Sequence, residues 1–134
     1  MNQMANHAYA SIRDFGDLLD YLRDREAGPT VLSSTRFCEI LGIDTDLLAE
    51  LASVPGSAAG PVSAWERVQC FIRATLRVLH AASDLNGDIE RTVVWFRNEP
   101  LVPFGHETAE RLVAKGRVED VIRYVMSLDA GVAG

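Results

Sequence analysis

The spacing of apolar residues is the feature that most constrains the fold of this 134-residue chain. In seven segments the apolar residues recur every three or four positions, a spacing that places them on one side of an α-helix. The longest segment covers residues 63–83, where Val68, Ile72 and Leu79 share one face. No segment of the sequence alternates apolar and polar residues as a β-strand would. The sequence therefore predicts an all-α fold.

Capping residues and a linker divide the predicted helices into three regions. Ser63 and Glu66 have the spacing of a capping box that opens the long helix, and Ser11 and Asp14 have the same spacing before the first helix. Residues 54–61 are rich in glycine, proline and small side chains, as linkers are. We therefore predict an N-terminal helical region over residues 1–62, a connecting helix over 63–86 and a small C-terminal helical domain over 87–134.

The composition is that of a soluble globular protein, with 48% of the residues hydrophobic and 24% charged. No apolar run approaches the ~20 residues of a membrane span. The first residues also lack the basic and apolar segments of a signal peptide. Cys38 and Cys70 form no C-x-x-C pair and are expected to be small side chains of the core. We therefore expect a cytoplasmic protein that does not bind a membrane.

The formal net charge of −6 is unevenly distributed along the chain. Residues 1–66 hold four arginines and ten acidic residues, whereas residues 67–134 hold nine basic and nine acidic residues. The first half would repel a phosphate backbone, so only the second half could approach a nucleic acid without an electrostatic cost.

Residues 34–51 have the length of a helix-turn-helix, with Gly42 between two helical patterns. The second of these helices carries Asp44, Asp46 and Glu50 and no basic residue. Helices that read DNA use cations on the phosphates and Arg, Asn or Gln on the base edges. We therefore interpret this segment as a degenerate helix-turn-helix that serves packing and does not read bases.

The polar face of the connecting helix offers another route to DNA. The residues opposite its apolar face are Glu66, Gln69, Arg73, Arg77 and His80. In a dimer, Arg67, Arg73 and Arg77 would form a stripe of cations that faces phosphates. One hypothesis is therefore a DNA-binding transcriptional regulator.

Catalytic signatures are absent from the sequence. It contains no nucleophile elbow, no phosphate-binding loop and no dinucleotide-binding fingerprint. The segment that starts at Asp84 has some residues of a calcium loop, but its glycine stands at the fourth position and Trp95 at the twelfth. His80 and Asp84 are four residues apart, and such a pair alone is a poor metal site. We therefore expect no enzymatic activity, no metal site and no cofactor.

The C-terminal third carries the most specific pattern. It reads Trp95-Phe96-Arg97-Asn98-Glu99-Pro100-Leu101, then Phe104-Gly105, Thr108-Ala109-Glu110, Leu112-Val113 and Gly116-Arg117. This pattern, over residues 87–134, resembles the toxin-binding domain of the Xre/MbcA/ParS family of antitoxins. Residues 63–86 stand in the place of the connecting helix of that family, and residues 34–51 in the place of its Xre-like helix-turn-helix.

The resemblance implies an antitoxin of a type II toxin-antitoxin system. Its partner would be a RES-domain toxin that consumes NAD or transfers ADP-ribose, and its C-terminal domain would cover the NAD pocket of the toxin. The resemblance also implies a homodimer, and repression of the promoter DNA of its own operon in complex with the toxin. The hypothesis of a DNA-binding regulator without a toxin partner stays open beside it.

The toxin-binding residues implied by the resemblance form two groups. An apolar loop and its helical supports would anchor the complex through Arg97, Pro100, Leu101, Val102, Phe104, Gly105, Arg111, Gly116 and Arg117. A slim, flexible tail of small residues would enter the cleft of the toxin through Gly131, Val132, Ala133 and Gly134. Trp95 is expected to be an ordinary core residue, because buried aromatic side chains outnumber exposed anchors.

Overall fold

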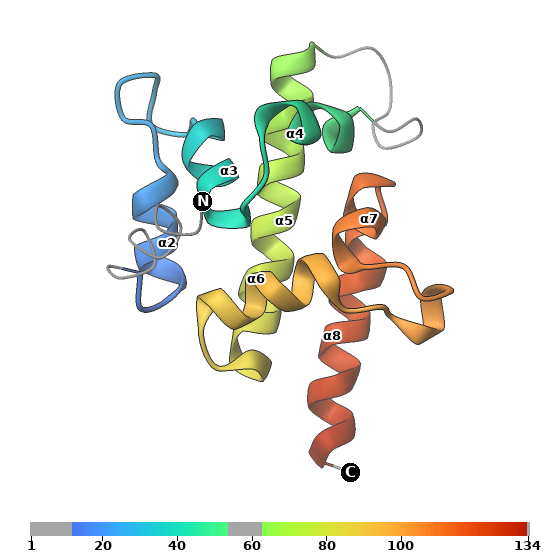
Figure 1. The fold of residues 1–134 in the computed structure, drawn as a ribbon. Helices are drawn as coiled ribbons and strands as arrows, with labels where there is room; N and C mark the ends of the chain where they lie inside the picture. Colours follow the sequence, from blue (N-terminus) through green and yellow to red (C-terminus); the bar gives the residue numbers. More distant parts are fainter. Residues whose placement is uncertain (1–11, 54–62, 134) are drawn as a thin grey trace.

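The computed structural model describes the backbone of residues 12–53 and 63–133, and the side chains of residues 12–53 and 63–130 (Figure 1). Within these ranges the regular secondary structure is helical, so the all-α prediction is confirmed. The helices are α2 (Phe15–Leu22), α3 (Ser34–Leu41), α4 (Thr45–Ala52), α5 (Ala64–Asn86), α6 (Ile89–Asn98), the 3-10 helix η1 (Val102–Phe104), α7 (Ala109–Ala114) and α8 (Val118–Ala133). The predicted linker, residues 54–61, lies outside the described residues.

Side-chain caps fix where most of these helices begin. In six helices the side chain of the N-cap residue accepts a hydrogen bond from a backbone N–H of the first turn, at Asp14, Ser33, Asp44, Ser63, Asp88 and Thr108. The predicted capping box of Ser63 and Glu66 is confirmed. The predicted cap of the first helix at Ser11 is wrong, because Asp14 accepts the bond from the Asp17 N–H and α2 starts at Phe15.

Helix α5 lies at the centre of the molecule and packs against α2, α3, α4, α6, α7 and α8 (Figure 1). It runs to Asn86, three residues past the end of the apolar pattern of residues 63–83, and Gly87 then donates its N–H to the Ser83 carbonyl. Although α5 has 23 residues, none of the described helices is apolar enough to cross a membrane. The predicted regions on either side of α5 are therefore held against a single central element.

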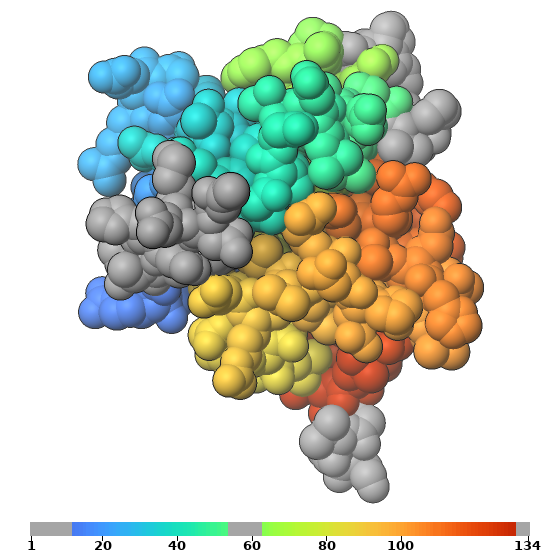
Figure 2. Space-filling model, in the orientation of Figure 1, coloured from blue at the N-terminus to red at the C-terminus, as the bar shows by residue number. Residues whose placement is uncertain are grey.

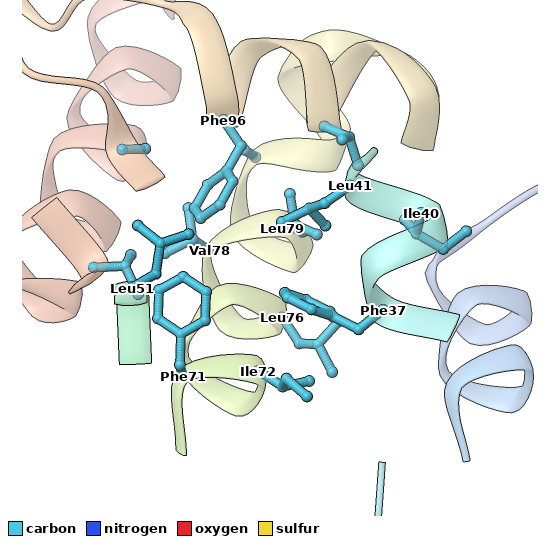
Figure 3. Packing of buried hydrophobic residues seen from close by; sticks show 14 of the residues in the cluster. Phe37, Ile40, Leu41, Leu51, Phe71, Ile72, Leu76, Val78, Leu79 and Phe96 are labelled. Carbon is cyan, nitrogen blue, oxygen red and sulfur yellow. The ribbon is translucent and has the colours of Figure 1, made fainter. Parts of the chain in front are cut away.

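The core consists of apolar side chains that these helices direct towards α5 (Figure 3). Phe37 of α3 and Phe71 of α5 meet edge to face with their ring centroids 6.2 Å apart, and Phe96 of α6 is fully buried beside them. One hydrophobic cluster includes residues from the N-terminal helices, from α5 and from the C-terminal helices. Folding of the three predicted regions is therefore coupled through shared packing.

The structure corrects the predictions for two residues of α5, Gln69 and Cys70. Gln69, predicted on the solvent face of α5, is 2% exposed. Its amide donates to the Leu32 carbonyl at 2.8 Å and accepts from the Leu32 N–H at 3.1 Å, which satisfies both backbone groups of a loop residue. Cys38 is buried as expected, but Cys70 is exposed because its position on α5 faces away from the core.

Candidate functional site

The α6–α7 loop, residues 99–108, is held in a compact shape by its own backbone. Leu101 donates its N–H to the Glu107 carbonyl at 2.9 Å, and the Leu101 carbonyl accepts from His106 and Phe104, each at 3.0 Å. Gly105 and His106 both have a positive φ, at 68° and 69°, which turns the chain back towards α7. The loop is thus a defined structural unit that leaves the helical body on the right of Figure 1.

The predicted apolar anchors of this loop divide into buried and exposed residues. Leu101 was expected on the binding surface, but it is 1% exposed and belongs to the core. Its side chain instead holds the loop to the body of the protein. Val102 is 68% exposed and Pro100 is also exposed, so both are accessible to a partner. The backbone at Leu101 is extended, so successive side chains point to opposite sides of the chain. The neighbours of the buried Leu101 side chain therefore face the solvent.

Phe104 connects the loop to the start of α8. Its ring meets that of Tyr124 edge to face with the centroids 5.7 Å apart, and the Arg117 guanidinium lies 5.1 Å from the Phe104 centroid. We call Phe104, Arg117 and Tyr124 the Phe104 platform. Edge-to-face and cation–π contacts of this kind are attractive and depend on geometry, so they favour one arrangement of the three side chains. The platform therefore presents a half-buried aromatic ring and a cation side by side.

Gly116 allows Arg117 to reach this position. It has a φ of 85°, a left-handed conformation that ends α7. The Arg117 N–H then donates to the Leu112 carbonyl at 2.9 Å, and the Arg117 side chain donates to Asp120 at 3.0 Å. The structure thus brings together Gly116, Arg117 and Phe104 of the predicted site.

Arg97 is partly buried between three helices. Its Nε donates to the Glu110 carboxylate at 2.9 Å, where the side chains are 27% and 8% exposed, and its Nη1 donates to the Leu41 carbonyl at 3.3 Å. Arg97 therefore connects α6, α7 and α3. The pair gives Arg97 a supporting role, because a buried carboxylate needs a paired cation, and its contact with a toxin stays a prediction.

Arg111 differs from Arg97 in being available to a partner. It is exposed on α7, and within the described part of the chain its side chain forms no hydrogen bond or ion pair. Nearby, Lys115 donates to Glu107 at 2.7 Å and connects the end of α7 to the α6–α7 loop. Trp95 is half-buried and packs against the core, in agreement with its prediction as a core residue.

The end of α8 extends beyond the helical body (Figure 1). Among its described side chains Val125 is the last buried one, and the five positions from Met126 to Ala130 are all exposed. Met126 is 64% exposed, and Leu128 is exposed as well. In Figure 2 this segment emerges in red beneath α6. The helix therefore offers apolar side chains that its own chain does not cover.

The predicted tail continues this helix. The backbone of Gly131, Val132 and Ala133 belongs to α8, where the sequence predicted a tail after the helix. Glycine weakens a helix by roughly 1 kcal/mol but does not end it unless a turn is also favoured. The side chains of residues 131–133 and the whole of Gly134 lie outside the described residues.

The predicted arginine stripe of α5 is partly engaged within the chain. Arg73 donates to the Thr30 carbonyl at 3.2 Å, and Arg77 pairs with Glu119 of α8 at 2.7 Å. Arg67 is half-buried and makes no side-chain hydrogen bond among the described residues. On α4, Asp46 and Glu50 are exposed, as the acidic pattern suggested. The α3–α4 pair therefore presents carboxylates where a DNA-reading helix presents cations.

The residues considered for catalysis do not assemble into a site within the described ranges. The His80 ring stacks on Phe15 with centroids 4.4 Å apart and forms no hydrogen bond with Asp84. Asp84 lies in α5 and Asp88 caps α6, so the sequence that resembled a calcium loop forms the end of α5, a short turn and the start of α6. No group of three or more His, Cys, Asp or Glu side chains among the described residues could hold a metal ion.

Two residues around the α6–α7 loop and the Phe104 platform were not among the predicted contacts. Tyr124 completes the platform, and its spacing of seven from Arg117, two turns along a helix, could have suggested that both lie on one side. Glu110 pairs with Arg97, and its position between Ala109 and Leu112 is a signal for a buried charge.

No protein-family model matches the chain, and no curated protein and no solved structure is significantly similar to it.

Proposed function

We propose that this protein is an antitoxin of a type II toxin-antitoxin system, which neutralises a RES-domain toxin by covering the NAD pocket of that enzyme. It acts by binding and makes or breaks no covalent bond. The proposal combines the resemblance of residues 87–134 to the toxin-binding domain with the surface that these residues form. The observation that carries it is an exposed Val102 beside the Phe104 platform, on a loop with defined backbone bonds.

This surface has the physical properties of a binding anchor. Binding energy is concentrated in a few apolar or aromatic side chains and arginines, supported by neighbours that exclude water. Val102 supplies the apolar side chain, Phe104 and Tyr124 the aromatic rings, and Arg117 the cation. Because Leu101 and the Arg97–Glu110 pair fix the loop from inside, little conformational entropy is lost on binding.

The end of α8 supplies the second requirement, a narrow element that can occupy a cleft. A helix without neighbours has a diameter of about 10–12 Å with side chains, and here its last described side chains include the exposed Met126 and Leu128. An apolar helix end of this size suits a pocket that otherwise receives a nucleotide, since ligand pockets are mostly apolar with few polar groups.

A pair of valine variants tests this proposal with a purified RES-domain toxin. Val102→Asp places a charge in the interface, so we expect its affinity for the toxin to fall by about tenfold or more. Val94→Asp is the matched control, because Val94 is 55% exposed on α6 and lies outside the α6–α7 loop and the Phe104 platform. Calorimetric titration measures both affinities. Equal affinity of the V102D variant and the unchanged protein would refute this binding surface.

A further inference from the structure

A shallow apolar groove lies between α2 and α5, on elements that take no part in the surface described above. Phe15 and Leu19 of α2, Leu76 of α5 and the loop residue Leu32 line a volume of about 270 Å³. Three basic side chains of α5 complete its lining: Arg73, Arg77 and His80. We call this the α2–α5 groove. It combines an apolar floor with cations along one wall.

We propose that the α2–α5 groove binds an acidic amphipathic helix of a partner protein. The leucines of that helix contact the apolar floor of the groove, and its carboxylates pair with the arginines of the wall. This binding is separate from neutralisation of the toxin, because the groove shares no residue with the α6–α7 loop or the Phe104 platform. The shape favours a helix, since a small ligand needs an enclosed pocket of about 300–1,000 Å³ whereas this groove is shallow and open to solvent.

The spacing of these polar side chains also matches a helix. Arg73, Arg77 and His80 are four and three residues apart, so they follow one another along α5 over about 10 Å. A docked helix presents its anchors with the same spacing, at positions i, i+3, i+4 and i+7. Carboxylates of the partner could therefore face Arg73 and Arg77 while its apolar side chains contact Phe15 and Leu19.

The arginines keep donors for such a partner. A guanidinium has five N–H groups. Arg73 uses one nitrogen on the Thr30 carbonyl, and Arg77 uses one on Glu119. Both side chains are exposed, and the stacked Phe15 ring fixes the orientation of His80. Glu119 thus already occupies the place on Arg77 that a carboxylate of the partner would share.

Charge complementarity distinguishes this partner from two other occupants. Residues 1–11 and 54–62 contain no aspartate or glutamate, so neither segment of this chain could supply carboxylates to the wall. A nucleic acid backbone would pair with Arg73 and Arg77 but would leave the apolar floor of Phe15, Leu19 and Leu76 uncovered. An acidic amphipathic helix satisfies both the floor and the wall.

A designed peptide tests the proposal without any toxin. The probe is an acetylated and amidated 18-residue helix with leucine at i, i+4 and i+7 and glutamate beside them, and its control has glutamine for glutamate. Fluorescence anisotropy measures binding to the full-length protein. We expect the glutamate peptide to bind about tenfold more tightly than the glutamine peptide, and R73Q/R77Q to abolish that difference. Arg67→Gln, on the same helix but outside the groove, should leave it unchanged.

A second variant adds a test that loss of folding cannot imitate. Glu119→Gln removes the internal competitor for Arg77, so we expect binding of the glutamate peptide to strengthen by about threefold. The proposal is overturned if both peptides bind equally or not at all. It is also overturned if R73Q/R77Q dissociates a dimer in sedimentation, which would place a second copy in the groove. Duplex DNA binding that falls equally in R67Q and R73Q/R77Q would likewise overturn it.

Discussion

The Glu110 carboxylate is surrounded by apolar side chains, and its ion pair with Arg97 compensates for its burial. Ala109, Leu112 and Val113 beside it are buried, and Arg97 donates to it at 2.9 Å. Removal of one member of a buried pair leaves an unpaired charge in a poorly solvated place. At the scale of single residues, Arg97 therefore stabilises the C-terminal helices, although the resemblance placed it in the binding surface.

Loss of this pair should lower the stability of the fold. We expect Glu110→Ala to reduce the free energy of unfolding by about 2 kcal/mol, less than for a fully buried pair because Arg97 is partly exposed. Glu107→Ala removes the more exposed pair with Lys115 and should cost less than about 1 kcal/mol. Urea denaturation compares the two variants. Equal losses would show that Glu110 is not the buried support described.

Tyr21 should titrate above the ordinary range of a tyrosine, because its pKa is raised. Burial raises the pKa of its phenol, and the hydrogen bond that it donates to Glu39 at 2.5 Å raises the pKa further. The folded state thus favours the protonated phenol. Its contribution to stability is complete below the unfolded pKa near 10 and is lost as the pH rises through the higher folded value.

Absorbance titration of the folded protein measures this effect. We expect one tyrosine to ionise above the usual range, and Tyr21→Phe to remove that late step and about 1 kcal/mol of stability. Tyr124→Phe serves as the control, because the described contact of Tyr124 is made by its ring with Phe104. A late step that survives in Y21F and disappears in Y124F would contradict the assignment.

At the scale of elements, periodicity predicts helices well but does not show which polar residues they bury. The pattern around Ser63 predicted the start of α5, since a capping box depends only on nearby residues. The same pattern placed Gln69 on the polar face, whereas the structure buries it against Leu32, 37 residues earlier. Contacts between distant segments, such as this one and the Arg97–Glu110 pair, leave little signal in local spacing.

Gln69 should therefore matter for the attachment of the α2–α3 loop to α5. We expect Gln69→Ala to lower the free energy of unfolding by about 2 kcal/mol, because it leaves both backbone groups of Leu32 without their partners. Hydrogen exchange should show faster exchange of the Leu32 amide. Arg73→Ala, which loses a single exposed bond to the neighbouring Thr30 carbonyl, should leave that amide protected. Unchanged exchange at Leu32 in Q69A would contradict this account.

At the scale of the whole molecule, one core supports two separate exposed features. Helix α5 contacts the helices on both of its sides, so the sequence regions 1–62, 63–86 and 87–134 meet in shared packing. Val102 of the α6–α7 loop and the end of α8, from Met126 to Ala130, lie exposed outside that packing. Removal of the end of α8 should leave the core intact, because none of the described side chains of α8 after Val125 is buried.

The most direct test of the proposed function is NAD consumption by the RES-domain toxin in the presence of a chain that ends at Val125. The full-length protein should prevent NAD loss at equimolar concentration. The shortened chain should unfold at nearly the same temperature, since residues 126–130 are exposed, yet protect NAD at least about tenfold less well. If the shortened chain inhibits the toxin as fully as the intact protein, the end of α8 does not occupy the NAD pocket and the central claim is wrong.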